Sequence, residues 1–255
     1  FMFEASERRS EDAIFLRHLR ERMEMLAGFA TRMRISDMAI SVKDLTKELR
    51  ANQALLKRLV RTEGVTEVQI LDDGELEAIV SIPSGALGKQ ALSAIIENII
   101  RDQAKYCKTT EVISVRVAAE ELVDPILRRD FVKIVLVDSG NNYEEVKNAV
   151  QPTLDDLRIC DSDGSLVSGN WGVKERFIMA ALLRGLRLED STWTSLHRTP
   201  SGQSIPVAAL SISNPPLAND GLPVLSLENR AGNAAWVLYL RKPRALALVA
   251  SSSTE

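Results

Sequence analysis

One helix-forming segment contains residues that could hold a metal ion and phosphate groups. Asn98 and Asp102 are four residues apart, so they lie on one helix face, and Tyr106 continues the same stripe. The carboxylate of Asp102 is a hard oxygen ligand of the kind that magnesium prefers, while Lys105 could meet phosphate charge. An exposed polar helix face is the alternative interpretation of these residues.

A second polar group follows an apolar, β-branched run. Residues 131–137 predict a buried strand, which stops at Asp138, Ser139 and Gly140. A carboxylate at a strand end can accept a hydrogen bond from an exocyclic amine such as that of adenine, and a glycine lets the backbone approach a ligand. The same three residues also form an ordinary turn in many proteins.

A third segment is a glycine-bounded loop that leads into a helix. Gly169 and Gly172 stand at its two ends, and helical periodicity follows over 173–186. Because the first N–H groups of a helix lack intrahelical partners, such a loop can bind phosphate. A capped loop without a ligand is the alternative.

The remaining pattern indicates the elements that position these segments. Apolar residues at helical spacing predict helices over 10–33 and 36–60, which would form a hairpin. Since two such stripes cannot bury each other alone, we expect a second copy to complete a four-helix bundle. Near residue 62 the sequence pattern changes from helical periodicity to short strands, which predicts a domain boundary. We expect the later strands and helices at 65–71, 77–82, 86–106, 112–117, 131–137, 146–157, 173–186 and 234–241, with 141–170 as a candidate lid.

Charge and composition exclude several classes of protein. The 255 residues include 32 Lys and Arg against 35 Asp and Glu, and a net charge of -3 gives no overall footprint for nucleic acid. The longest apolar runs are far shorter than the roughly 20 residues that span a bilayer, so we expect no membrane segment in this piece. Cys107 and Cys160 are isolated, which favours a reducing, cytoplasmic setting. Residues 244–255 are expected to be a tail or a linker to a further domain.

In this order, the three polar segments resemble the ATP-binding domain of the GHKL superfamily, which includes histidine kinases, gyrase B, heat-shock chaperone ATPases and mismatch-repair ATPases. The chain looks most like a bacterial histidine kinase core. Residues 94–107 are similar to the N box, 134–140 to the G1 box, and 169–186 to the second glycine box and its helix. The resemblance implies an α+β chain: a GHKL-type α/β sandwich over 62–243, with helices on one face of a mixed sheet and ATP under a lid. It also implies a dimerisation and phosphotransfer hairpin over 1–61.

The resemblance assigns roles to individual residues. Asp102 takes the magnesium position, where kinases usually have asparagine, and Asp138 takes the adenine-recognising position. The other residues implied in nucleotide binding are Asn98, Lys105, Tyr106, Gly140, Gly169 and Gly172. Two features depart from the family pattern: Asn142 stands where the G1 box has a further glycine, and the second glycine box is shortened. Because asparagine tolerates left-handed backbone angles, we expect Asn142 to be a mild change.

A histidine on the first predicted helix is the candidate phosphoacceptor. His18 lies in a segment loosely similar to a histidine-kinase H box, and Glu21, one turn later, could orient its imidazole. Leu19 and Met23 stand where that family has an acidic residue and a proline. A polar residue on a bundle surface is the alternative role for His18.

The leading hypothesis is a histidine-kinase-type signalling core. It would bind ATP with magnesium, dimerise through its N-terminal helices, phosphorylate His18 and pass the phosphoryl group to a response-regulator receiver domain. One alternative is a degenerate pseudokinase that acts as a dimeric nucleotide-sensing or scaffold module. Another is a GHKL ATPase clamp, which needs a glutamate as general base where Asn98 stands; Glu97 points about 100° away around the helix.

Overall fold

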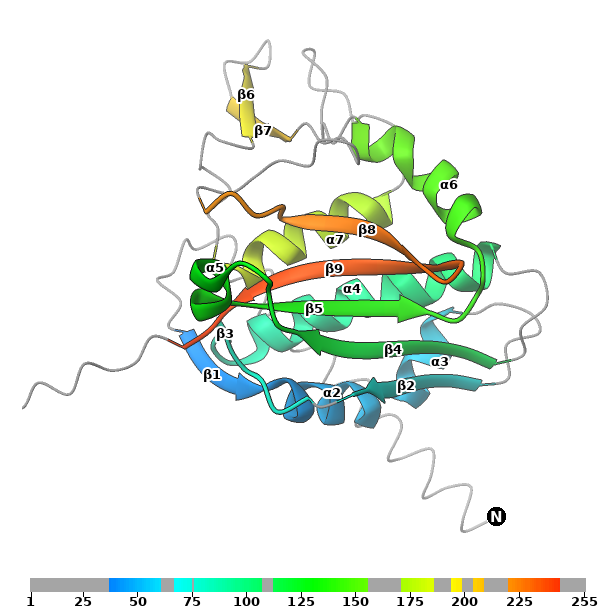
Figure 1. Ribbon diagram of the computed structural model, residues 1–255. Helices are drawn as coiled ribbons and strands as arrows, with labels where there is room; N and C mark the ends of the chain where they lie inside the picture. The colour runs from blue at the N-terminus through cyan, green and yellow to red at the C-terminus, as the bar shows by residue number, and fades with distance from the viewer. Residues whose placement is uncertain are drawn as a thin grey trace, which may run out of the picture.

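A mixed β-sheet carries helices on one face in the computed structural model (Figure 1). The structure describes residues 37–60, 67–74, 76–106, 112–155, 171–185, 194–198, 204–208 and 220–243. The strands of the main sheet are β1 (Asp37–Ser41), β2 (Glu67–Asp73), β3 (Ile79–Pro83), β4 (Val112–Glu120), β5 (Phe131–Asp138), β8 (Leu225–Arg230) and β9 (Asn233–Arg241). The helices are α2 (Val42–Ala51), α3 (Gln53–Val60), α4 (Ala86–Tyr106), α5 (Pro125–Asp130), α6 (Tyr143–Asp155) and α7 (Trp171–Leu183).

The sheet places β5 at its centre. Its strand order is β1-β3-β9-β5-β4-β2, and β8 pairs with β9. The β2–β4 pair is parallel, while the other pairs are antiparallel. A separate two-stranded sheet consists of β6 (Thr194–Arg198) and β7 (Ser204–Ala208). The mixed sheet with helices on one face agrees with the architecture expected from the sequence.

The core lies between the sheet and the long helix α4. Alternate residues of β5, such as Ile134 and Leu136, point into this core, and α4 contributes Ile95 and Ile99. Helix α7 packs beside α4 on the same face of the sheet, where it also contacts β8 and β3. None of the described helices is long and apolar enough to cross a membrane.

The predicted second helix of the N-terminal hairpin, over 36–60, is wrong in its start and in its continuity. Residues 37–41 form strand β1, which pairs with β3, and the helix begins only after Ser41, whose Oγ accepts from the N–H of Asp44 at 3.0 Å. The turn at Asn52 then separates α2 from α3. The first predicted helix, over 10–33, lies outside the described residues.

Helices α2 and α3 pack on the α/β core instead of forming a hairpin apart from it. Leu45, Leu49 and Leu56 belong to the same buried cluster as the sheet. At the edge of the sheet, Arg50 Nε donates to the carbonyl of Ile70 at 2.9 Å, and the N–H of Ile70 donates to Gln53 Oε1 at 3.0 Å. The described part of the predicted hairpin is therefore continuous with the α/β unit, which differs from the boundary predicted near residue 62.

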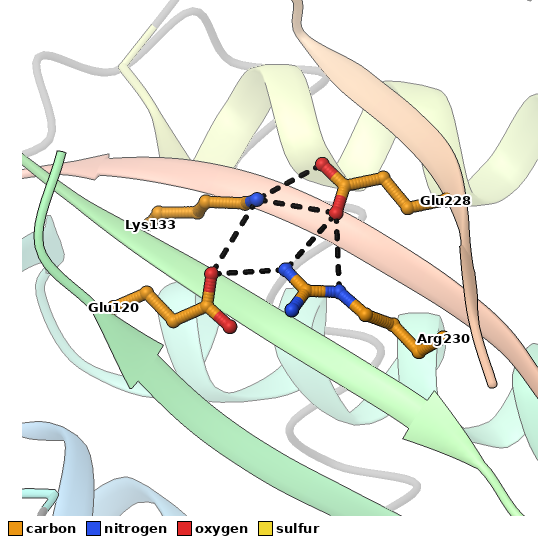
Figure 2. Close-up of polar contacts among 4 residues, drawn as sticks. All are labelled: Glu120, Lys133, Glu228 and Arg230. Atoms are coloured by element: carbon orange, nitrogen blue, oxygen red, sulfur yellow. Dashed lines mark hydrogen bonds and ion pairs between the residues drawn. The ribbon is translucent and has the colours of Figure 1, made fainter. Parts of the chain in front are cut away.

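The other face of the sheet bears an ion-pair network that spans three strands (Figure 2). Lys133 on β5 lies between two glutamates, with Nζ 2.9 Å from Glu228 Oε1 and 3.4 Å from Glu120 Oε2. Arg230 Nη2 is 3.0 Å from Glu120 Oε2 and 3.1 Å from Glu228 Oε2. The four side chains thus alternate in charge across β4, β5 and β8, above the intervening strand β9.

Replacement of Lys133 with methionine is expected to lower the free energy of unfolding by about 1 kcal/mol, because it leaves two glutamates close together with one cation between them. Urea unfolding at low and high salt would measure the loss, which should shrink at high salt. Arg129→Met is a suitable control, since Arg129 is exposed and its Nε lies 3.6 Å from Asp130 Oδ1. An equal loss in both variants would contradict a role for the network.

Candidate functional site

Most of the predicted site residues that the structure describes lie where the C-terminal half of α4 meets the end of β5 (Figure 1). Gln103 Nε2 donates to Ser139 Oγ at 2.8 Å, which ties α4 to the residue after β5. The N–H of Tyr143, at the start of α6, donates to the carbonyl of Gly232 in the β8–β9 turn at 2.9 Å. Four elements therefore hold the end of β5 in a fixed place.

Asp138 is the buried carboxylate of this site. Its side chain lies at the end of β5, and the residue is 2% exposed. Oδ1 accepts hydrogen bonds from the N–H of Ala234 at 3.1 Å and of Gly140 at 3.3 Å. With its amide nitrogen turned toward the carboxylate, Asn142 donates to Oδ2 at 3.0 Å and Oδ1 at 3.2 Å. Three donors, two from the turn after β5 and one from β9, thus orient one carboxylate.

The pKa of Asp138 is raised from 3.8 to about 6, chiefly by burial and to a smaller extent by the negative charge of Asp102. The hydrogen bonds from Gly140, Ala234 and Asn142 act in the opposite direction because they favour the ionised form. The contribution of Asp102 shows that the two carboxylates predicted from separate segments lie near enough to interact. A perturbed carboxylate held by convergent donors is typical of a ligand-binding position.

Asn142 has a role that the sequence did not reveal. The left-handed backbone conformation expected at Asn142 occurs one residue earlier, at Asn141, which has φ 46°. Asn142 itself is buried, and its amide orients Asp138. The departure from glycine at this position therefore adds a side-chain donor to the site.

Asp102 contacts a buried cation. Its Oδ2 lies 2.6 Å from Nη1 of Arg176 on α7, and Arg176 is 0% exposed. The guanidinium carbon of Arg176 is 4.1 Å from the ring centroid of Trp236 on β9, a distance typical of a cation–π contact. Arg176 is thus held between a carboxylate on α4 and an aromatic ring on the sheet.

This ion pair does not fit the magnesium role expected of Asp102. A guanidinium stays charged in proteins, and breaking a buried pair by removing one partner costs about 3–5 kcal/mol. A metal bound by Asp102 would have to compete with Arg176 for the carboxylate.

Asn98 links α4 to α7. Its Nδ2 donates to the carbonyl of Ala94 at 2.9 Å and to Oε2 of Glu175 at 2.9 Å. Asn98 is buried and lies one turn before Asp102, so the two predicted N-box residues both contact α7. Their shared helix face is therefore a packing surface with polar contacts and not a solvated one.

The other predicted residues are placed in different ways. Lys105 is exposed at the end of α4, with Nζ 5.0 Å from the ring centroid of Tyr106, so its charge is available to a ligand. Gly140 supplies a donor to Asp138, and Gly172 lies in the first turn of α7. The remaining predicted residues, Gly169, His18 and Glu21, lie outside the described residues.

Sequence reasoning missed Arg176 because it stands in a charged run, where Lys174, Glu175 and Arg176 are consecutive. The signal that could have found it is helical spacing: Arg176 is three residues after Val173 and four before Ala180, so it shares their buried face. An arginine on an apolar helix face needs a partner, and the structure shows that this partner is Asp102 on α4.

A cavity in the described structure lies away from these residues. It has a volume of about 220 Å³ and lies between α2 and the N-terminal half of α4, lined by residues that include Leu45, Leu49 and Ser93. None of the predicted site residues lines it. The cavity is therefore not part of the site around Asp138.

No family model and no curated protein matches the chain. Among solved structures, the catalytic domain of histidine kinase ThkA is similar, with 9% identity over 82% of this chain and 97% of that chain and a TM-score of 0.40. The mycobacterial sensor histidine kinase MprB has 12% identity over 82% and 99%, with a TM-score of 0.38. The Acinetobacter baumannii histidine kinase AdeS has 10% identity over 94% and 83%, with a TM-score of 0.40.

All three are histidine kinases. At these identities and scores the similarity assigns no activity to this chain, so the function must be argued from the site residues themselves.

Proposed function

We propose that this chain is an adenine-nucleotide-binding signalling module of the histidine-kinase type. The observation that carries the proposal is Asp138, a buried carboxylate at the end of a central strand, oriented by three donors and close to a second carboxylate. An ionised carboxylate in this position can accept a hydrogen bond from the exocyclic amine of adenine. Lys105, exposed at the end of α4, would meet phosphate charge.

The kinase reaction is the finer part of this proposal. In it, His18 accepts the γ-phosphoryl group, Glu21 orients the imidazole, and Gly169 and Gly172 contact the phosphates. Such transfer depends on positioning and charge neutralisation more than on covalent chemistry by the protein. The phosphoryl group would then pass to the aspartate of a response-regulator receiver domain, and the segment around His18 would carry the dimer contact.

A second candidate function is a dimeric pseudokinase that binds nucleotide as a signal without transferring phosphate. The Asp102–Arg176 ion pair favours it, because the residue expected to hold magnesium already has a buried cation as its partner. Incubation with ATP labelled on its γ-phosphate separates the two candidates. Acid-labile label that is lost in His18→Gln supports the kinase, whereas bound nucleotide without label supports the pseudokinase.

Calorimetry with ATP tests the nucleotide site. We expect Asp138→Asn to weaken binding about ten- to a hundredfold, because a hydrogen bond to a charged acceptor is worth about 1.5–3 kcal/mol. Asp130→Asn is the matched control: it removes the same charge directly before the other end of the strand, where Asp130 is exposed. Equal affinity of both variants, or no binding to the unmodified chain, would refute the site.

The affinity should also depend on pH. Since burial raises the pKa of Asp138 to about 6, the acceptor is ionised at pH 7 and becomes protonated as the pH falls below about 6. Nucleotide affinity in the unmodified chain should therefore decrease over this range. The Asp138→Asn variant should lose this dependence and Asp130→Asn should keep it.

A further inference from the structure

The buried ion pair between Asp102 and Arg176 stands at the position where a magnesium ion was expected. The Arg176 guanidinium carries a permanent positive charge, lies 2.6 Å from the Asp102 carboxylate, and is wholly shielded from solvent. It is fixed from the opposite side by the ring of Trp236. The fold therefore supplies a cation of its own to the carboxylate that would otherwise attract a metal.

The guanidinium also has unused donors. Within the described structure, Nε, Nη1 and Nη2 of Arg176 make no hydrogen bond, and the contact with Asp102 is an ion pair defined by distance. Buried donors without acceptors are rare in native proteins and need an explanation. With no exposed surface, the guanidinium depends on the charge of Asp102 and on the ring of Trp236 for its stabilisation.

Asp102 and Arg176 lie beside the candidate nucleotide site. The charge of Asp102 contributes to the raised pKa of Asp138, and Gln103, the residue after Asp102, hydrogen-bonds to Ser139. By pairing with Asp102, Arg176 neutralises a carboxylate that would otherwise repel a nucleotide bound at Asp138. A metal held by Asp102 would instead have to displace a cation that cannot leave, because Arg176 is part of the chain.

We infer that Arg176 takes the place of the divalent metal, so that this chain binds adenine nucleotide without magnesium. The inference rests on the proposed function, since it concerns the same nucleotide site. It separates this chain from a site in which phosphate binding is mediated by a bound metal ion, and it names Arg176 as a positioning residue that neutralises Asp102 beside the nucleotide site.

The first measurement is the affinity for ATP in EDTA and in excess Mg²⁺. We expect the two dissociation constants to agree within about twofold, and an affinity at least about tenfold higher with Mg²⁺ would overturn the inference. In Arg176→Gln, Asp102 is released, so the affinity in EDTA should fall about tenfold or more and Mg²⁺ should restore part of it. Arg129→Gln is the control, because Arg129 is exposed, lies on α5 and carries the same charge.

A second measurement does not depend on nucleotide. Mn²⁺ binding is followed by the loss of the free-ion signal in electron paramagnetic resonance, with the unmodified chain, Asp102→Asn and Arg176→Gln. We expect no specific Mn²⁺ site in the unmodified chain. A stoichiometric site that Asp102→Asn removes would overturn the inference even if Arg176→Gln failed to fold.

The two measurements keep the proposals apart. If ATP binds under neither condition, the proposed nucleotide function fails, while the Mn²⁺ result still decides whether Asp102 is a metal ligand or the partner of Arg176. If ATP binds only with Mg²⁺ and Mn²⁺ binds at Asp102, the nucleotide function stands and the inference about Arg176 is refuted. Circular dichroism of each variant confirms that it is folded before the affinities are compared.

Discussion

Replacement of Asp138 with asparagine should stabilise the empty fold at neutral pH while it weakens nucleotide binding. Burial raises the pKa of Asp138 from 3.8 to about 6, so the folded chain holds this proton more tightly than the unfolded chain. The interval between these values corresponds to about 3 kcal/mol at about 1.36 kcal/mol per pH unit. Asparagine carries no charge and avoids this penalty.

The sign of the pH dependence follows from proton counts. Between about pH 4 and 6 the folded state binds more protons than the unfolded state, so this carboxyl makes the free energy of unfolding fall as the pH rises. Asp138→Asn should remove that fall: the two proteins should be similarly stable near pH 4, and the variant should be more stable by about 2–3 kcal/mol at pH 7.

Hydrogen bonding should survive the change. The oxygen of the introduced asparagine can accept from the N–H groups of Ala234 and Gly140, and rotation of the Asn142 amide offers an acceptor to the new NH2 group. Urea unfolding at pH 4 and pH 7 measures the difference, with Asp130→Asn as the control for loss of one exposed charge. A variant that is less stable than the unmodified chain at pH 7 would show that the ionised carboxylate stabilises the fold.

Truncation of Trp236 should cause the largest loss of stability among these substitutions. Trp236 is buried on β9, faces α7, and stacks on the guanidinium of Arg176 at 4.1 Å. Replacement of a buried tryptophan with alanine costs about 3–5 kcal/mol through lost contacts and the cavity that remains. Here the change also removes the aromatic face that holds a buried cation.

Trp236→Phe is the matched comparison, because phenylalanine keeps an aromatic ring and most of the volume. We expect Trp236→Ala to lose about 3–5 kcal/mol and Trp236→Phe clearly less. The transitions are followed by far-ultraviolet circular dichroism in urea, since Trp171 and Trp193 also contribute to fluorescence. A loss below about 1 kcal/mol in Trp236→Ala would mean that the ring is not part of the core.

The helices and strands that were predicted correctly are those with long, regular patterns of apolar residues. The helix predicted over 86–106 is α4 from Ala86 to Tyr106, because its apolar residues recur at helical spacing over six turns without a proline. The β-branched run over 131–137 is β5, which ends at Asp138. The segment over 36–60 was mistaken for one helix because the Ser41 cap and the break at Asn52 are single residues inside an apolar periodicity.

The candidate site was predictable only where one segment carried its own signal. Asp138 was found because it ends a strand, but the donor from Ala234 comes from 96 residues later in the chain. The pairing of Asp102 with Arg176 depends on how α4 packs against α7, which no local pattern specifies. The prediction for Asn142 considered only its backbone preference. In the structure the turn after β5 directs its side chain toward Asp138, where the amide donates hydrogen bonds.

The contacts of Arg50 and Gln53 with Ile70 protect the chain against self-association. Strand β2 is the last strand at its side of the sheet, and an edge strand with free backbone groups can recruit a strand from another molecule. At Ile70 both the N–H and the carbonyl are already bonded to side chains from α2 and α3. A neighbouring chain would have to displace both side chains to pair at Ile70, so the middle of this edge is protected against strand addition.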